Sequence, residues 1–238
     1  MSTYKLDQLI TLPREVEQIL VVLDKSGFFN DGLLVGSWTF PFYRELFGIE
    51  YYLRTNDVDF ALGPEVLKKK SSTDIEAALI AEGISSVMDN LTGLQKFLWG
   101  TFGIEFLIHR KGGREEIVTV NKYNIHAQPL PFLDLLFMSP LEIKVSQYTV
   151  RIPSLEALFL HKLIIAQRRK KESKRLKDLE QCSVMAPHLD QKILAELAHS
   201  YSMSRTTVQN IKRSCAAIDI PADFLWSGDS LSGFGGEF

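Results

Sequence analysis

The chain has 238 residues, of which 45% are apolar and 24% charged, a globular composition rather than that of a disordered or membrane-embedded protein. This length allows one large domain or two modest ones with a sizeable core. The formal net charge of −2 argues against a protein that binds nucleic acid over its whole surface, although it leaves room for a local basic patch.

The cysteines and the N-terminal residues narrow the expected setting. Cys182 and Cys215 stand far apart, without a Cys-x-x-Cys pair or clustered histidines, so neither a zinc site nor a disulfide framework is predicted. The first residues lack the basic start and apolar core of a signal peptide, and no apolar run reaches transmembrane length. A cytoplasmic setting without membrane association is therefore expected.

The first elements in chain order enclose a pair of small residues. Residues 13–26 and 38–47 are predicted to be helices, and residues 33–35 form a short buried strand between them. Gly36 and Ser37 follow that strand at once. A glycine lets a phosphate approach the backbone, a serine hydroxyl can donate to it, and the next helix presents free N–H groups. The pattern predicts a phosphate contact; the alternative is a glycine that only permits a tight turn.

Residues 50–54 are predicted to extend into the next strand, which ends at residues 60–62 and carries two carboxylates. Because side chains alternate faces along a strand, Asp57 and Asp59 point the same way, roughly 6–7 Å apart at Cα, while Val58 and Phe60 point into a core. Two like charges this close raise one another's pKa unless a cation sits between them. An oxygen-only site suits Mg²⁺, so the pair predicts a metal site; the alternative is an exposed strand end or turn.

A third carboxylate lies on a later predicted strand. Residues 73–81 are predicted to be a helix, and residues 85–100 carry no clear pattern. Residues 103–108 form a strand in which Glu105 is the lone acid, either a third carboxylate facing the first two or the partner of a salt bridge. After a turn, residues 116–120 are predicted to return as the second strand of a hairpin.

The character of the sequence changes after residue 153. Ser154 is predicted to cap a long amphipathic helix over residues 155–170, with Lys162 at the border of its inward face. Strands followed by helices predict an α+β protein in which helices flank a small mixed β-sheet and a helical bundle follows. The predicted organisation is a catalytic domain over residues 1–150, a helical C-terminal domain over 151–226 and a flexible tail over 227–238.

The order of these motifs resembles the polymerase-β-like nucleotidyltransferase superfamily, whose pattern is Gly-Ser, Asp-x-Asp or Asp-x-Glu, and a third acid. Residues 54–60, Arg-Thr-Asn-Asp-Val-Asp-Phe, are similar to the Arg-x-Thr/Ser-x-Asp-Ile-Asp segment of stand-alone bacterial members, including toxins of the abortive-infection type. Lys162 with residues 168–178 is similar to their Lys…Arg…Lys-Asp signature. The resemblance covers residues from about 30 to 185. The chain departs from the pattern in its third acid, a glutamate at 105, and in the twenty or so residues before Asp57.

The resemblance implies a polymerase-β-like core and transfer of a nucleoside monophosphate from an NTP, such as ATP, to an acceptor hydroxyl with release of pyrophosphate. It implies that Asp57, Asp59 and Glu105 are catalytic and hold Mg²⁺ or Mn²⁺, with Glu105 helping to deprotonate the acceptor. The implied nucleotide-binding residues are Gly36, Ser37, Arg54, Thr55 and Lys162. The acceptor is a small molecule, RNA or a protein hydroxyl; the sequence names neither it, nor the base, nor the oligomeric state.

Several residues have simpler interpretations. Lys162 is also explained as a helix lysine that reaches solvent, and Arg54 as the salt-bridge partner of an acid. Asp178 is predicted to be structural, paired with Lys162 or a neighbouring arginine. The basic segment 168–178 either contacts a polynucleotide acceptor or is a solvated helix end.

Two other functions compete with the enzyme. Residues 197–212 have a spacing similar to a helix-turn-helix, in which Ser204 caps a recognition helix and Arg205, Gln209 and Lys212 would contact DNA. The alternative for this segment is two packed helices of the C-terminal bundle. The remaining possibility is a non-catalytic member that binds nucleotide to sense or scaffold, against which the three acids argue.

Overall fold

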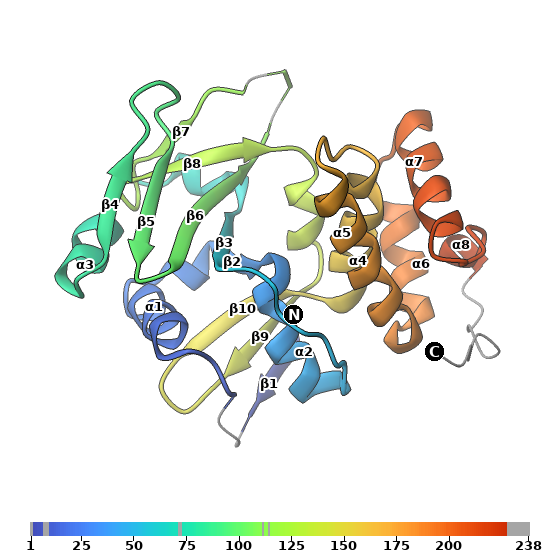
Figure 1. Ribbon diagram of the computed structural model, residues 1–238, viewed down its shortest axis with the longest axis horizontal. Helices are drawn as coiled ribbons and strands as arrows, with labels where there is room; N and C mark the ends of the chain where they lie inside the picture. Colours follow the sequence, from blue (N-terminus) through green and yellow to red (C-terminus); the bar gives the residue numbers. More distant parts are fainter. Residues whose placement is uncertain (1, 7–9, 71–72, 111, 114, 228–238) are drawn as a thin grey trace. The chain divides into compact units, whose positions relative to one another are not determined.

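The structure is a computed structural model that describes residues 2–6, 10–70, 73–110, 112–113 and 115–227 (Figure 1). By its internal contacts the chain divides into a sheet unit, residues 1–45 and 52–153, and a helical unit, residues 46–51 and 154–238. Apart from Ser227, the predicted tail lies outside the described residues, and the predicted domain boundaries stay a prediction.

The sheet unit contains a mixed sheet whose main strands lie in the order β2-β3-β6-β5-β4. These strands are β2 (Gly32–Val35), β3 (Asp57–Leu62), β4 (Ser85–Met88), β5 (Gln95–Trp99) and β6 (Phe102–His109). Strands β3 and β6 run parallel, and the other neighbours in this order run antiparallel. Beyond the point where β5 leaves it, β6 pairs in parallel with β8 (Ile125–Leu130). This mixed sheet with flanking helices confirms the predicted α+β class.

Two segments of this sheet differ from the sequence prediction. Residues 85–100, which carried no clear pattern, form the β4–β5 hairpin, and the Asp89 carboxylate accepts the N–H groups of Leu91 and Thr92 in its turn. The strand expected to return against β6 is β7 (Val118–Val120), which pairs with β8 among the described residues. Strand β8 buries every second residue, so it covers more of the core beside β6 than β7 does.

The sheet unit also contains helices, and aromatic side chains form a core on one face of its sheet. The helices are α1 (Arg14–Lys25), α2 (Phe40–Phe47) and α3 (Ile75–Ala81), the last capped by the Asp74 carboxylate, which accepts the N–H of Ala77. Aromatic rings meet with centroids 5.6–5.8 Å apart, three of them from the strands (Phe60, Phe97 and Phe106) and two from turns (Phe28 and Tyr123). This packing fixes which face of β3, β5 and β6 is left for other side chains.

A second sheet and several single turns complete the sheet unit. Strand β1 (Ser2–Lys5) pairs in parallel with β9 (Pro140–Lys144), which pairs antiparallel with β10 (Thr149–Pro153). The 3-10 turns of the sheet unit are η1 (Phe28–Asn30), η2 (Gly36–Thr39), η3 (Pro64–Lys68) and η4 (Leu133–Phe137). The sequence pattern did not predict the pairing of β1 with β9.

The helical unit is organised around one buried helix. The helices are α4 (Leu155–Ala166), α5 (Glu172–Met185), α6 (Gln191–Ser200), α7 (Arg205–Ala216) and α8 (Phe224–Ser227), with the turn η5 (Ala186–His188). The Ser154 hydroxyl caps α4 by accepting the N–H of Ala157 at 3.2 Å, as predicted. Every residue of α4 except Ile165 is buried, because α5, α6 and α7 all pack on it (Figure 1).

The central helix is shorter than predicted. It ends at Ala166, four residues before the predicted end, where the exposed residues Arg168, Arg169 and Lys170 begin. A helix surrounded by others has no solvent face on which to place three cations, so the chain leaves the bundle there. No helix in the described part of the chain is long and apolar enough to cross a membrane.

Candidate active site

Three carboxylates share one face of the central strands. In β3, Asp57 and Asp59 alternate with buried apolar residues, and in β6 Glu105 does the same. The parallel register pairs Asp59 with Glu105, and neighbouring strands lie about 4.8 Å apart. The structure therefore brings together the three acids that the sequence singled out, on the face opposite the aromatic core.

The residues around Asp57 hold it at the open start of its strand. The Thr55 hydroxyl accepts the N–H of Asp57 at 3.2 Å, which fixes the turn before β3. The N–H of Gly103 donates to the Asn56 carbonyl at 3.0 Å, and a Cβ on Gly103 would lie 3.5 Å from Asp57 Oδ1. Asp57 is exposed. The described contact of Thr55 is with the backbone, and its nucleotide contact stays a prediction.

The Gly36-Ser37 turn lies against the second carboxylate. Strand β2 pairs Val35 with Asp59, so the turn begins directly beside that acid. Gly36 has φ +73°, and a Cβ built there would lie 3.0 Å from Asp59 Oδ2. The Thr39 hydroxyl donates to the Gly36 carbonyl at 2.8 Å and closes the turn, in which Ser37 is buried. Only glycine satisfies both the backbone angle and the close approach of this turn.

A lysine that the sequence analysis did not single out also belongs to this face. Phe97 of β5 pairs with Ile104, which places Lys96 opposite Glu105, and the two side chains form an ion pair. The hydrogen bond to Glu105 raises the pKa of Lys96 against the effect of burial, and the charges of Asp57 and Asp59 raise it further. Lys96 is therefore a cation within electrostatic reach of all three acids. Residues 95–99 are two polar residues followed by three apolar ones, without strand-like alternation, so the sequence carried no signal for Lys96.

Two of the three acids, Asp57 and Asp59, form a pair that suits a magnesium ion. Among the described residues, no three His, Cys, Asp or Glu side chains are arranged to hold a metal ion together. Mg²⁺, however, is commonly bound by one or two carboxylates plus water and substrate phosphates. Asp57 and Asp59 supply such a pair on an accessible face, whereas Glu105 is engaged by Lys96. The metal-binding role of Glu105 stays a prediction.

Lys162 lies in the helical unit in a buried ion pair. Its Nζ donates to Asp178 Oδ1 at 3.0 Å, and Arg169 Nε donates to Oδ2 of the same carboxylate at 2.6 Å. Burial by itself raises the pKa of Asp178, but the charges of Lys162 and Arg169 outweigh it and lower the pKa. The predicted structural pairing of Asp178 with Lys162 is confirmed. Nucleotide contacts of Lys162, and of the exposed Arg54, stay predictions.

The two segments considered for nucleic acid both belong to the helical bundle. Arg168, Arg169 and Lys170 are exposed between α4 and α5. Ser204 caps α7 by accepting the N–H of Thr207 at 3.2 Å, as predicted, and both α6 and α7 pack on α4. The residues of α7 considered for DNA are all exposed: Arg205, Gln209 and Lys212. Contact with nucleic acid stays a prediction for both segments.

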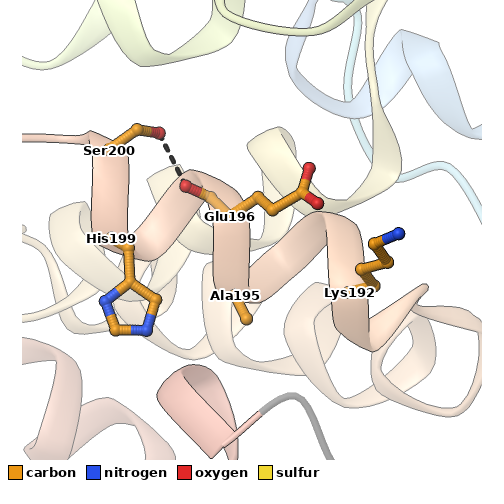
Figure 2. Close-up of a pocket in the computed structure, with 5 residues that line it drawn as sticks. All are labelled: Lys192, Ala195, Glu196, His199 and Ser200. Atoms are coloured by element: carbon orange, nitrogen blue, oxygen red, sulfur yellow. Dashed lines mark hydrogen bonds between the residues drawn. The ribbon is translucent and has the colours of Figure 1, made fainter.

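A surface hollow of about 630 Å³ lies along one helix of the helical unit (Figure 2). Its lining residues all come from one face of α6: Lys192, Ala195, Glu196, His199 and Ser200. The hydroxyl of Ser200 donates to the carbonyl of Glu196 at 2.6 Å, so it is satisfied within its own helix. A site for a small molecule needs polar groups that converge from several elements, and this hollow offers only one helix face.

The fold, the shared face of the acids and the glycine turn agree with the comparison with known families. A family described as nucleotidyltransferase matches residues 14–205, which include all of the acids and the turn. The chain belongs to this nucleotidyltransferase family and is an enzyme of that class. The search of curated proteins found no matching sequence.

Solved structures similar to the chain carry related descriptions. An antigenic nucleotidyltransferase-like protein from Paracoccidioides brasiliensis is 16% identical, covers 93% of this chain and 96% of its own, and has a TM-score of 0.46. ANT(2'')-Ia in complex with adenylyl-2''-tobramycin is 13% identical over 86% of this chain and 95% of its own, with a TM-score of 0.43. A tRNA-processing enzyme is 14% identical over 92% of this chain and 52% of its own, with a TM-score of 0.35.

Proposed function

We propose that the protein transfers a nucleoside monophosphate from an NTP to the hydroxyl of an acceptor. The observation that carries this proposal is the approach of the Gly36 turn to Asp59, which makes one acid of a same-face pair the neighbour of a phosphate-type turn. The acceptor oxygen attacks the α-phosphorus, the bond from that phosphorus to the bridging oxygen breaks, and pyrophosphate leaves. The hydroxyl proton passes to Glu105.

Asp57 and Asp59 would hold Mg²⁺, or Mn²⁺, in the loaded enzyme. The bound ion supplies neutralisation of the triphosphate charge and acidifies a hydroxyl that it contacts. The exposed position of Asp57 suits an ion that keeps water and phosphate oxygens as its remaining ligands. These two acids are therefore the residues on which transfer depends most.

The remaining residues of the face position the substrate. The backbone N–H groups after Gly36 and the Ser37 hydroxyl would hold the phosphates that leave, at the start of η2. The turn that Thr55 closes sets the direction in which Asp57 points. Arg54 precedes this turn and would add a positive charge to the nucleotide. Phosphoryl-type transfer needs mainly such positioning and charge neutralisation, and little covalent chemistry from the protein.

Lys162 contributes to nucleotide binding only if its ammonium leaves a buried carboxylate. Its side chain is 6% exposed and is paired with Asp178, which is 5% exposed. A Lys162→Met variant separates the two roles. If Lys162 contacts the nucleotide, the variant has a higher KM for the NTP and unchanged stability. If Lys162 is structural, the variant is less stable, and its folded fraction keeps the KM of the wild type.

The test of the proposed function is transfer of label. The protein is incubated with each α-labelled NTP and Mg²⁺, in parallel with total RNA, a protein extract and a small-molecule extract. We expect one acceptor class to gain label, and Asp57→Asn/Asp59→Asn to abolish the gain. Equal labelling by the wild type and the double variant would overturn the proposal. Label on RNA or protein would support a toxin-type role, and label on a small molecule a modifying role.

One observation favours a second function alongside transfer. Arg205, Gln209 and Lys212 are exposed at helical spacing on α7, the helix that Ser204 caps. This face would contact DNA in the manner of a recognition helix. Salt-dependent binding to duplex DNA that Arg205→Ala weakens would support it, and absence of binding at low salt would remove it.

A further inference from the structure

We propose that Lys96 keeps Glu105 out of metal coordination in the nucleotide-free protein, so that the free chain takes one divalent ion, on Asp57 and Asp59. This inference rests on the proposed metal-dependent function and adds a positioning residue to it. Lys96 would occupy, as an ammonium group, the place that a second divalent ion would otherwise take beside Glu105.

The register of three strands places the charges in one row. Asp59 pairs with Glu105 across β3 and β6, and Lys96 lies opposite Glu105 across β6 and β5. The side chains of this row share the face opposite the aromatic core, because Phe60, Phe106 and Phe97 follow them in their strands and are buried. Across the sheet, the order of these side chains is therefore Asp59, Glu105 and Lys96. Lys96 contacts Glu105, and the other acid, Asp59, is the one beside Gly36.

The ion pair divides the acids into two groups. Glu105 is bound to Lys96, its side chain is 17% exposed, and the described residues contain no trio of acids arranged to share a metal. Asp57 and Asp59 remain on the accessible face. A surface ion pair between two such residues is usually worth little. Here its consequence is geometric, because the pair engages the carboxylate of Glu105 with a side chain of the neighbouring strand.

The charge of Lys96 also opposes a second ion beside Glu105. A second divalent ion that bound Glu105 in the absence of nucleotide would have to displace the ammonium group already paired with it. The Lys96 side chain is 45% exposed, so its ammonium group has solvent access and is free to move when the phosphates of a nucleotide offer other partners.

The test is a double-mutant cycle in which the affinity and stoichiometry of Mn²⁺ binding are measured. Mn²⁺ binding to the nucleotide-free protein is measured by electron paramagnetic resonance and calorimetry for the wild type, Lys96→Met, Glu105→Gln and Lys96→Met/Glu105→Gln. We expect one ion per wild-type chain and little effect of Glu105→Gln alone. We expect Lys96→Met to bind Mn²⁺ about twofold to fivefold more tightly or to gain a second ion, the change that corresponds to one partly exposed ion pair. Glu105→Gln should remove that gain.

Controls separate the possible failures. Lys96→Arg keeps the charge and should behave as the wild type, and Lys68→Met removes a lysine from another exposed ion pair and should change nothing. Thermal unfolding verifies that each variant is folded. Equal loss of Mn²⁺ affinity on Glu105→Gln in both backgrounds would overturn the inference, as would unchanged affinity in Lys96→Met or absence of Mn²⁺ binding in the wild type. A chain that shows the cycle but labels no acceptor would refute the proposed transfer and keep this inference.

Discussion

The sheet unit and the helical unit each contain a cluster of charged side chains, and the two clusters are built in opposite ways. In the sheet unit, the carboxylates of Asp57, Asp59 and Glu105 lie on an accessible face, and Lys96 pairs with Glu105. In the helical unit, one carboxylate, Asp178, receives two cations and is buried. The first cluster gathers acids on a surface that solvent reaches, and the second surrounds one buried acid with two cations.

The difference shows how a fold separates charges that serve a ligand from charges that serve stability. A buried charge without a partner costs several kcal/mol, so the helical unit surrounds Asp178 with Lys162 and Arg169. An accessible cluster is solvated by water and tolerates an excess of one sign until a cation arrives. Substitutions should therefore change activity in the first cluster and stability in the second.

The largest expected effect is on activity in the sheet unit. Asp57→Asn/Asp59→Asn should lower nucleotidyl transfer by about 10³-fold or more, because a bound metal contributes several kcal/mol to such a reaction. The melting temperature should stay the same or rise, since the substitution removes repulsion between two acids on one face of the strand. Initial rates and thermal melts measure both. Glu65→Gln, in an exposed ion pair with Lys68, is the control, and an unfolded double variant would contradict the comparison.

The next effect is on stability in the helical unit. Asp178→Asn should lower the free energy of unfolding by about 3–5 kcal/mol, because it leaves Lys162 buried without its counter-charge. Denaturant unfolding measures the change, and Glu172→Gln, which breaks the exposed pair with Arg175, should show none. Because the pKa of Asp178 is lowered in the fold, its contribution is present above pH 3.8 and is lost as the pH falls below that value. An Asp178→Asn variant as stable as the wild type would contradict the stabilising role of the buried pair between Lys162 and Asp178.

A smaller effect tests the contact between the glycine turn and its acid. Gly36→Ala should cost about 1–2 kcal/mol of stability for its left-handed backbone and should also lower activity at least about tenfold, because the new Cβ displaces Asp59. Gly83→Ala is the matched control: Gly83 has φ +86° and nothing within 4 Å of the added Cβ. It should lose similar stability and keep its activity. Equal activity losses in the two variants would remove the special role of Gly36.

The smallest effect concerns a buried histidine, His161, next to the ion pair of Lys162 and Asp178. Burial, with the charge of Lys162, lowers the pKa of His161 to about 3 from an ordinary value of 6.5. Between these values the unfolded chain binds a proton that the folded chain does not, so stability should fall as the pH falls from 6.5, by about 1–2 kcal/mol at pH 5. His161→Gln should flatten this dependence, measured by unfolding at pH 7 and pH 5. An identical slope in both proteins would contradict a neutral buried His161.

The sequence by itself determined those features that depend on local pattern. Alternation in residues 57–62 placed two acids on one side of a strand and apolar residues on the other, and the structure has this arrangement. Ser154 and Ser204 were recognisable as helix caps because the chemistry of a cap involves only the next three residues. The order of the glycine turn and the acids was enough to suggest the family.

Only the tertiary structure decided which of these features meet. The pairing of Asp59 with Glu105 depends on the parallel register of strands forty residues apart, which no local pattern specifies. Lys96 lay in a segment without a recognisable pattern, and its position beside Glu105 follows from the register of β5 against β6. Lys162 had the spacing of a residue at the border of a helix face, but the helices around α4 bury it against Asp178. Burial depends on the elements that surround a side chain. The sequence therefore indicated most of the charged groups, and the packing decided which of them a ligand can reach and which are buried inside the fold.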